Sequence, residues 1–133
     1  MKKILTILGC VILFAASSCT KQYVNPGTTN ETIYATVNPS DWKLYTTDNK
    51  SYFASINVPD LSSGATSFAG VLVAISYDNG ATYEQLPEVY NGTSFSFTYS
   101  AGNVSIYAQS PDGGTAIQPT AAVKVKIILV DSN

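Results

Sequence analysis

The chain has 133 residues, with seven lysines, nine acidic residues, and no arginine or histidine. Without arginine, and with so few lysines, it lacks both the bidentate phosphate contacts and the positive field that nucleic-acid binding requires, so a nucleic-acid partner is excluded. The missing histidine removes the commonest general base and metal ligand. The composition therefore favours a non-catalytic protein without a metal or other cofactor.

The first 18 residues have the three parts of a secretory signal peptide. Lys2 and Lys3 form a basic start, residues 4–16 are apolar, and Ser17 and Ser18 are the small residues of a cleavage site. The apolar run has 13 residues, whereas a helix that spans a bilayer needs about 20. We therefore expect residues 1–18 to be removed from the mature protein.

Cys19 directly follows these small residues, and the segment resembles the lipobox of bacterial lipoproteins, with Ala15 or Ala16, depending on the alignment, where leucine is usual. Cys10 leaves with the signal peptide, so the mature chain keeps one thiol and cannot form an intramolecular disulfide. The resemblance implies palmitate-type acylation of Cys19, and each buried acyl methylene stabilises membrane attachment by about 0.8 kcal/mol. The alternative is a chance cysteine beside an ordinary cleavage site.

Residues 19–30 are polar, are interrupted by Pro26-Gly27, and show no apolar period, so we interpret them as the acylated cysteine and a flexible tether. At about 3.3 to 3.6 Å per extended residue, the tether holds the body at most roughly 40 Å from the bilayer. Thr20 follows the cysteine where inner-membrane retention in enteric bacteria uses aspartate. The expected location is the cell envelope, at the outer membrane rather than the inner.

Residues 31–133 show the period of two that is typical of β-strands. The alternation is regular in 94–100, where Phe95, Phe97 and Tyr99 fall on one face. The expected strands are residues 32–37, 42–45, 52–58, 70–77, 82–86, 94–100, 104–108 and 122–130. Turn residues such as Asn-Gly separate them. This pattern predicts an all-β, antiparallel, immunoglobulin-like sandwich of seven or eight strands, with the apolar last strand central or covered at its end.

One motif stands between two of these strands: Ser76, Asp78, Gly80, Thr82 and Tyr83 follow the pattern Ser-x-Asp-x-Gly-x-Thr-aromatic. It resembles the Asp-box of sialidases and other carbohydrate-active proteins, with tyrosine where tryptophan is usual. In those proteins the box is structural and lies away from the catalytic residues. The resemblance implies a stable hairpin, and a single copy does not support a propeller.

Two aromatic residues are candidates for ligand contact. Trp42 either packs in the core or stacks on a ligand, and the core is the commoner place for a sandwich tryptophan. Tyr107 has the opposite parity to Val104, Ile106 and Ala108, which predicts that its ring projects from the outer face of its strand. There the ring can stack on a ligand or pack against a loop.

Three carboxylates, Asp78, Glu84 and Glu88, lie close in sequence and could serve glycoside hydrolysis or calcium binding. A turn aspartate and a solvated strand edge explain them more simply. No serine has a histidine to activate it. We therefore expect no catalytic residues.

The layout as a whole resembles small Gram-negative bacterial lipoproteins, a group without known activity. The shared features are the lipobox, the tether, Trp42, the Gly-Val-Leu-Val strand at 70–73 and the Val-x-Val-x-Ile-Ile end at 123–128. Two hypotheses follow. The protein is a non-catalytic envelope module that binds a protein or glycan through loops or an outer sheet face, or it is an assembly lipoprotein that presents edge strands to another chain.

Overall fold

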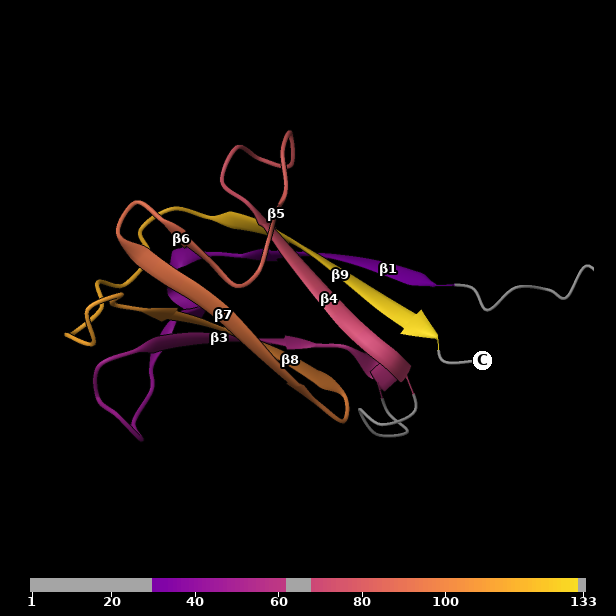
Figure 1. Ribbon diagram of the computed structural model, residues 1–133, viewed down its shortest axis with the longest axis horizontal. Coiled ribbons are helices and arrows are strands. Elements are labelled where there is room, and N and C mark those ends of the chain that lie inside the picture. The colour runs from indigo at the N-terminus through magenta and orange to yellow at the C-terminus, as the bar shows by residue number, and fades with distance from the viewer. Residues whose placement is uncertain (1–29, 62–67, 132–133) are drawn as a thin grey trace, which may run out of the picture.

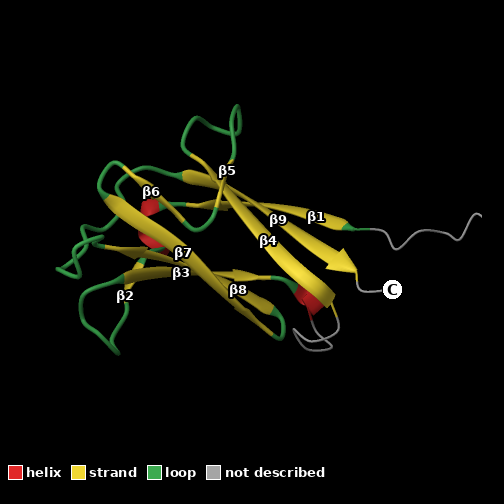
Figure 2. Cartoon of the chain, in the orientation of Figure 1, coloured by secondary structure: helices red, strands yellow, loops and turns green. Residues whose placement is uncertain are grey.

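The computed structural model describes residues 30–61 and 68–131. The predicted signal peptide, Cys19 and all but the last residue of the predicted tether lie outside the described residues. Two antiparallel sheets pack face to face (Figures 1 and 2), which confirms the predicted all-β sandwich.

The first sheet has four strands in the order β1–β9–β4–β5. Its members are β1 (Glu31–Val37), β9 (Val123–Asp131), β4 (Phe68–Ser76) and β5 (Glu84–Gln85). The last strand, β9, pairs with β1 on one side and β4 on the other. The predicted central position of this apolar strand is therefore confirmed.

The second sheet has five strands in the order β2–β3–β8–β7–β6. They are β2 (Lys43–Leu44), β3 (Tyr52–Asn57), β8 (Asn103–Gln109), β7 (Thr93–Ser100) and β6 (Glu88–Tyr90). The sandwich thus has nine strands, one more than the upper expectation. The unexpected strand is β6, which begins just after a cis Leu86–Pro87 peptide where the chain crosses from β5 into the second sheet.

The core lies between the sheets and is built by alternate residues of each strand. It contains Val71, Val73, Ile75, Val104, Ile106, Val125, Ile127 and Leu129, all buried. Each fully buried side chain of this size stabilises the fold by about 1.5–3 kcal/mol. Because the inward positions are consistently apolar, the period of two in the sequence is sufficient to define which face of each strand is outward.

Two short 3-10 turns, η1 (Pro39–Asp41) and η2 (Pro59–Leu61), follow β1 and β3. Glu31 pairs with Leu129, so the start of β1 and the end of β9 lie at the same end of the sandwich (Figure 1). The longer loops gather at the opposite end, where the Ala116 N–H donates to the Lys50 carbonyl at 2.8 Å.

Candidate functional site

Three aromatic rings form a cluster on the outer face of the five-stranded sheet. Tyr45 lies edge-on to both of the others, with ring centroids 5.5 Å from Tyr107 and 5.8 Å from Phe53. Phe53 and Tyr107 are directly opposite each other on β3 and β8, with centroids 6.4 Å apart. All three side chains are half-buried. Tyr107 therefore lies on the outer face, where its parity placed it, and keeps part of its ring open to solvent.

The side chains around this cluster on β3, β7 and β8 are polar and uncharged, whereas Lys43 on β2 lies directly opposite Phe53. Thr98 Oγ1 donates to Tyr107 Oη at 3.4 Å, and Ser55 Oγ donates to Asn103 Oδ1 at 2.7 Å. The outward polar positions of β3, β7 and β8 are Ser55, Asn57, Ser94, Ser96, Thr98, Ser100, Asn103, Ser105 and Gln109. We call these residues, together with the three rings, the neutral face, because the outward positions of these three strands carry no charge.

The chemistry of the neutral face suits a saccharide. Hydroxyl and amide side chains both donate and accept hydrogen bonds, as sugar hydroxyls do. Aromatic rings offer an apolar surface, and tyrosine adds a polar tip. A neutral sugar ring has the matching combination of apolar C–H faces and hydroxyl edges. An ionic ligand, in contrast, finds no opposite charge on the three strands.

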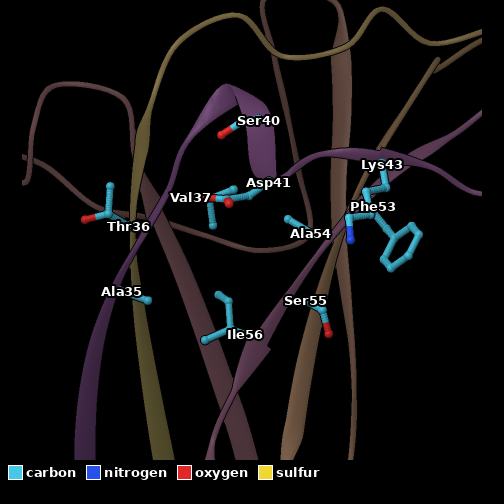
Figure 3. A pocket seen from close by; sticks show the side chains of 10 residues that line it. All are labelled: Ala35, Thr36, Val37, Ser40, Asp41, Lys43, Phe53, Ala54, Ser55 and Ile56. Atoms are coloured by element: carbon cyan, nitrogen blue, oxygen red, sulfur yellow. The ribbon is translucent and has the colours of Figure 1, made fainter.

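A hollow of about 500 Å³ opens at the side of the sandwich between β1 and β3 (Figure 3). We call it the side groove. Ala35 on β1 and Ile56 on β3 stand on its two walls, and η1 closes one end with Ser40 and Asp41. Phe53 also lines it. The side groove and the neutral face therefore meet along the edge of β3.

A smaller hollow of about 280 Å³ lies at the loop end of the sandwich. The rings of Tyr77 and Tyr90 stack in its wall, 3.7 Å apart and nearly parallel. Tyr77 Oη donates to Glu88 Oε1 at 2.8 Å, and burial, followed by this hydrogen bond, raises the pKa of Tyr77 well above its usual range. Ile117 borders the hollow and is 81% exposed. These rings mainly contact each other and seal the end of the core.

The five residues of the Asp-box motif form a compact loop between β4 and β5. Ser76 is buried; its Oγ donates to Asp78 Oδ1 at 2.7 Å and accepts the Gly80 N–H at 2.8 Å. Thr82 donates its hydroxyl and its N–H to the Asp78 carboxylate. These hydrogen bonds, with that of the Thr82 hydroxyl first, lower the pKa of Asp78 to about 2. Gly80 has a φ of 93°, which suits glycine.

Tyr83 completes this loop by lying over the outer face of the first sheet. Its ring centroid is 6.2 Å from that of Tyr34 and 5.8 Å from Lys126 Nζ. The side-chain contacts of the five motif residues are made within the loop or to this sheet. The motif is therefore a folded turn whose polar groups form hydrogen bonds with one another.

The three acids near the motif do not form one cluster. Asp78 accepts hydrogen bonds from its own loop, whereas Glu88 accepts one from Tyr77 Oη and lies close enough to Glu84 to interact electrostatically. Burial and the Glu84 carboxyl raise the pKa of Glu88. Among the described residues, no group of three or more acidic, cysteine or histidine side chains could hold a metal ion.

Trp42 lies in the core and is only 3% exposed. Its ring packs against Phe95 with centroids 6.2 Å apart, and its Nε1 is buried without a hydrogen-bond partner. The candidate ligand role of Trp42 is therefore corrected, because the ring offers no face to a molecule in solvent. Of the two interpretations of this residue, packing in the core is the one that fits.

Sequence reasoning found Tyr107 but missed Tyr45 and Phe53. The alternation in 52–58 places Phe53 on the face opposite to the buried Ala54, so its outward direction was available from the sequence. Its position opposite Tyr107 was not available, because it depends on the register between β3 and β8, and Phe53 and Tyr107 are 107 − 53 = 54 residues apart in the chain. The cluster forms only because β3 and β8 pair in this register.

No family model, curated protein or solved structure matches the chain. Within residues 30–61 and 68–131, no helix is long and apolar enough to cross a membrane. Over the described residues, the fold is an antiparallel sandwich of nine strands.

Proposed function

We propose that this protein is a lipid-anchored, non-catalytic module of the bacterial cell envelope that binds a neutral glycan on its neutral face. The observation that carries the proposal is the cluster of Tyr45, Phe53 and Tyr107 beside the uncharged hydroxyl and amide side chains of β3, β7 and β8. Half-buried rings that pack edge-to-face are already held in position. Little side-chain entropy is therefore lost when a ligand stacks on them.

The composition of the face favours a glycan over a protein as its ligand. The cores of protein interfaces are mainly apolar, with aromatic and arginine anchors and a charged rim. The neutral face instead carries hydroxyl and amide groups across three strands and has one aromatic cluster. Along β8 from Asn103 to Gln109 it extends for about 20 Å at 3.4 Å per residue. Its extended shape suits several linked sugar units.

The anchor is argued from the N-terminal sequence. The signal-like residues 1–18, Cys19 and the polar tether place the expected lipid ahead of β1. Thr20 favours the outer membrane over the inner. Glycans are abundant in this compartment, and a tether of this length leaves the sandwich free to reorient towards them. Cys19→Ser is expected to abolish incorporation of labelled palmitate and to leave uncleaved precursor; equal labelling of variant and wild type would contradict the anchor.

Binding is tested by a glycan array probed with the full-length lipoprotein in detergent micelles. The variant is Tyr107→Ala, and the matched control is Tyr34→Ala, which removes an outward ring from the other sheet; Tyr34 is 64% exposed. The proposal predicts signals on neutral glycans that disappear in Tyr107→Ala and remain in Tyr34→Ala. An array without reproducible signals, or signals lost equally in both variants, would remove the glycan from the proposal.

The side groove favours a second candidate function, an assembly role in which an edge strand pairs with another chain. The specific observation is that β2 has only two residues and leaves most of β3 without a neighbour on that side. Unpaired edges of this kind are templates for strand addition. The two functions use adjoining surfaces, because the side groove and the neutral face share Phe53 and Ser55 at the edge of β3.

A further inference from the structure

The edge of β3 that borders the side groove is open over four residues. β2 pairs with β3 only at Tyr52 and Phe53. Beyond that point, no other described strand pairs with the side of β3 that faces away from β8. The segment from Ala54 to Asn57 is therefore paired on one side only.

The hydrogen-bond pattern shows which backbone groups point outward along this edge. The Tyr45 N–H donates to the Ser51 carbonyl at 2.7 Å, so these residues form a hydrogen-bonded pair of the β2–β3 hairpin. In an antiparallel ladder such pairs recur at every second residue, so the backbone groups of Phe53 also face β2. The same alternation directs the N–H and C=O groups of Ser55 and Asn57 away from β8 and along the mouth of the groove.

The groove beside these groups has space for side chains. Its walls carry the small or half-buried apolar residues Ala35, Ala54 and Ile56, and its volume is about 500 Å³. A strand added to β3 would lie about 4.8 Å from it and would direct alternate side chains between the two sheets. Small apolar side chains are the ones that the walls of the groove would accept.

Two acidic residues lie beyond the end of the groove that is away from η1. They are Glu31 at the start of β1 and Asp60 in η2, and their side chains are close enough to interact electrostatically. Loss of solvent and the neighbouring Asp60 raise the pKa of Glu31. A basic side chain placed here would relieve the repulsion between the two carboxylates.

We propose that the side groove binds an extended segment of a partner protein, which adds to the free edge of β3 as a further strand. Its main chain bonds the outward groups of Ser55 and Asn57, and its inward side chains are small and apolar. A lysine or arginine at one end lies between Glu31 and Asp60. This interaction is independent of glycan binding, although the added strand would extend the sheet that carries the neutral face.

The probes are acetylated and amidated peptides of the form Lys-X-Thr-X-Thr-X, where X is alanine or valine in all combinations, and the matched set with glutamate in place of lysine. Binding to the full-length lipoprotein in detergent micelles is followed by fluorescence anisotropy. At least one lysine peptide should bind, its glutamate counterpart should bind more weakly, and the difference should shrink at high salt.

Two variants test the edge itself. Ser55→Pro removes the outward N–H, and proline is tolerated on edge strands, so affinity should fall about tenfold or more; Ser55→Thr keeps the N–H and should bind like the wild type. Ala35→Leu narrows the groove from the opposite wall, leaves β3 unchanged, and should also weaken binding. Urea unfolding checks that each variant is folded.

Three outcomes would overturn the proposal: no member of the lysine set binds the wild type, Ser55→Pro binds as tightly as Ser55→Thr, or Ala35→Leu leaves the affinity unchanged. Glycan binding is measured on Ala35→Leu, because Ala35 lies on β1 and outside the neutral face, whereas Ser55 belongs to that face. An Ala35→Leu protein that loses the peptide but keeps the glycan separates this inference from the function proposed for the neutral face.

Discussion

The two outer faces of this sandwich are built from strands of the same kind, yet their aromatic rings have different partners. On the first sheet, Tyr83 lies against Tyr34 and under Lys126 Nζ, and the Asp-box loop covers Ser76. On the second sheet, Tyr107 and its two neighbours contact one another among uncharged polar groups.

This difference shows that exposure alone does not define a candidate site. Tyr34 is 64% exposed, more than any ring of the neutral face, but its ring contacts Tyr83, which a loop brings over the same sheet. Lys124 Nζ donates to Thr36 Oγ1 at 2.9 Å on the same face. The first face therefore carries positive charge and a covering loop, whereas the second offers prearranged rings beside outward positions of β3, β7 and β8 that carry no charge.

The largest expected effect is on the loop that covers the first face. Ser76→Ala removes a buried hydroxyl that accepts the Gly80 N–H and donates to Asp78, so we expect a loss of about 1–3 kcal/mol in the free energy of unfolding. Urea unfolding measures it. Glycan binding by the folded variant should be unchanged; a stable variant that no longer binds would place the site on the loop.

A smaller effect in the same loop depends on pH. The pKa of Asp78 is lowered to about 2 in the folded protein, so its ionised form favours folding. That contribution is fully present above the unfolded value near 3.9 and is lost as pH falls through about 2. The wild type should be more stable than Asp78→Asn at pH 7, and the gap should close towards pH 2. A gap independent of pH in urea unfolding would contradict this assignment.

The coupling energy between rings of the neutral face is expected to exceed that between the rings of the first face. The edge-to-face contact between Tyr45 and Tyr107 is expected to contribute about 0.5–1.5 kcal/mol beyond the area that it buries. A double-mutant cycle with Tyr45→Leu and Tyr107→Leu, followed by urea unfolding, measures this term. The matched cycle on Tyr34 and Tyr83 is expected to give a smaller coupling, because those rings are tilted and 6.2 Å apart. Equal coupling energies in the two cycles would show that the rings of the neutral face are no more tightly prearranged than Tyr34 and Tyr83.

The smallest expected effect lies at the loop end and has the opposite sign. Burial and Glu84 raise the pKa of Glu88, so the folded state favours the protonated acid and loses stability as pH rises through the folded pKa. Glu88→Gln keeps an acceptor for Tyr77 and should be slightly more stable than the wild type at pH 7 but not at pH 4. Thermal unfolding at both values tests this, and a destabilised variant at pH 7 would count against it.

The sequence predicts most strands of this fold because inward and outward residues alternate so regularly. The period of two identifies the outward direction of Tyr107, and the apolar run at 127–130 indicates the central position of β9. The sequence pattern did not identify β6, because a strand of three residues that follows a proline is too short to show a period of two. The signal peptide, Cys19 acylation and location stay predictions.

The surfaces were less predictable than the strands because they depend on pairing. The neutral face requires the register that sets Phe53 opposite Tyr107, and the side groove requires that β2 end after two residues. Neither property has a local signal in the chain. The Asp-box motif, in contrast, has a local signal, and its residues form a loop whose hydrogen bonds are also local.

The central claim is that the prearranged rings of the neutral face, and not the exposed ring of the first face, bind the ligand. Isothermal titration of the neutral oligosaccharide with the strongest array signal tests it on the wild type, Tyr107→Ala and Tyr34→Ala. We expect Tyr107→Ala to raise Kd about 30-fold, as for a central aromatic anchor, and Tyr34→Ala to stay within about twofold of the wild type. A Kd that Tyr107→Ala leaves unchanged while Tyr34→Ala raises it would contradict the account.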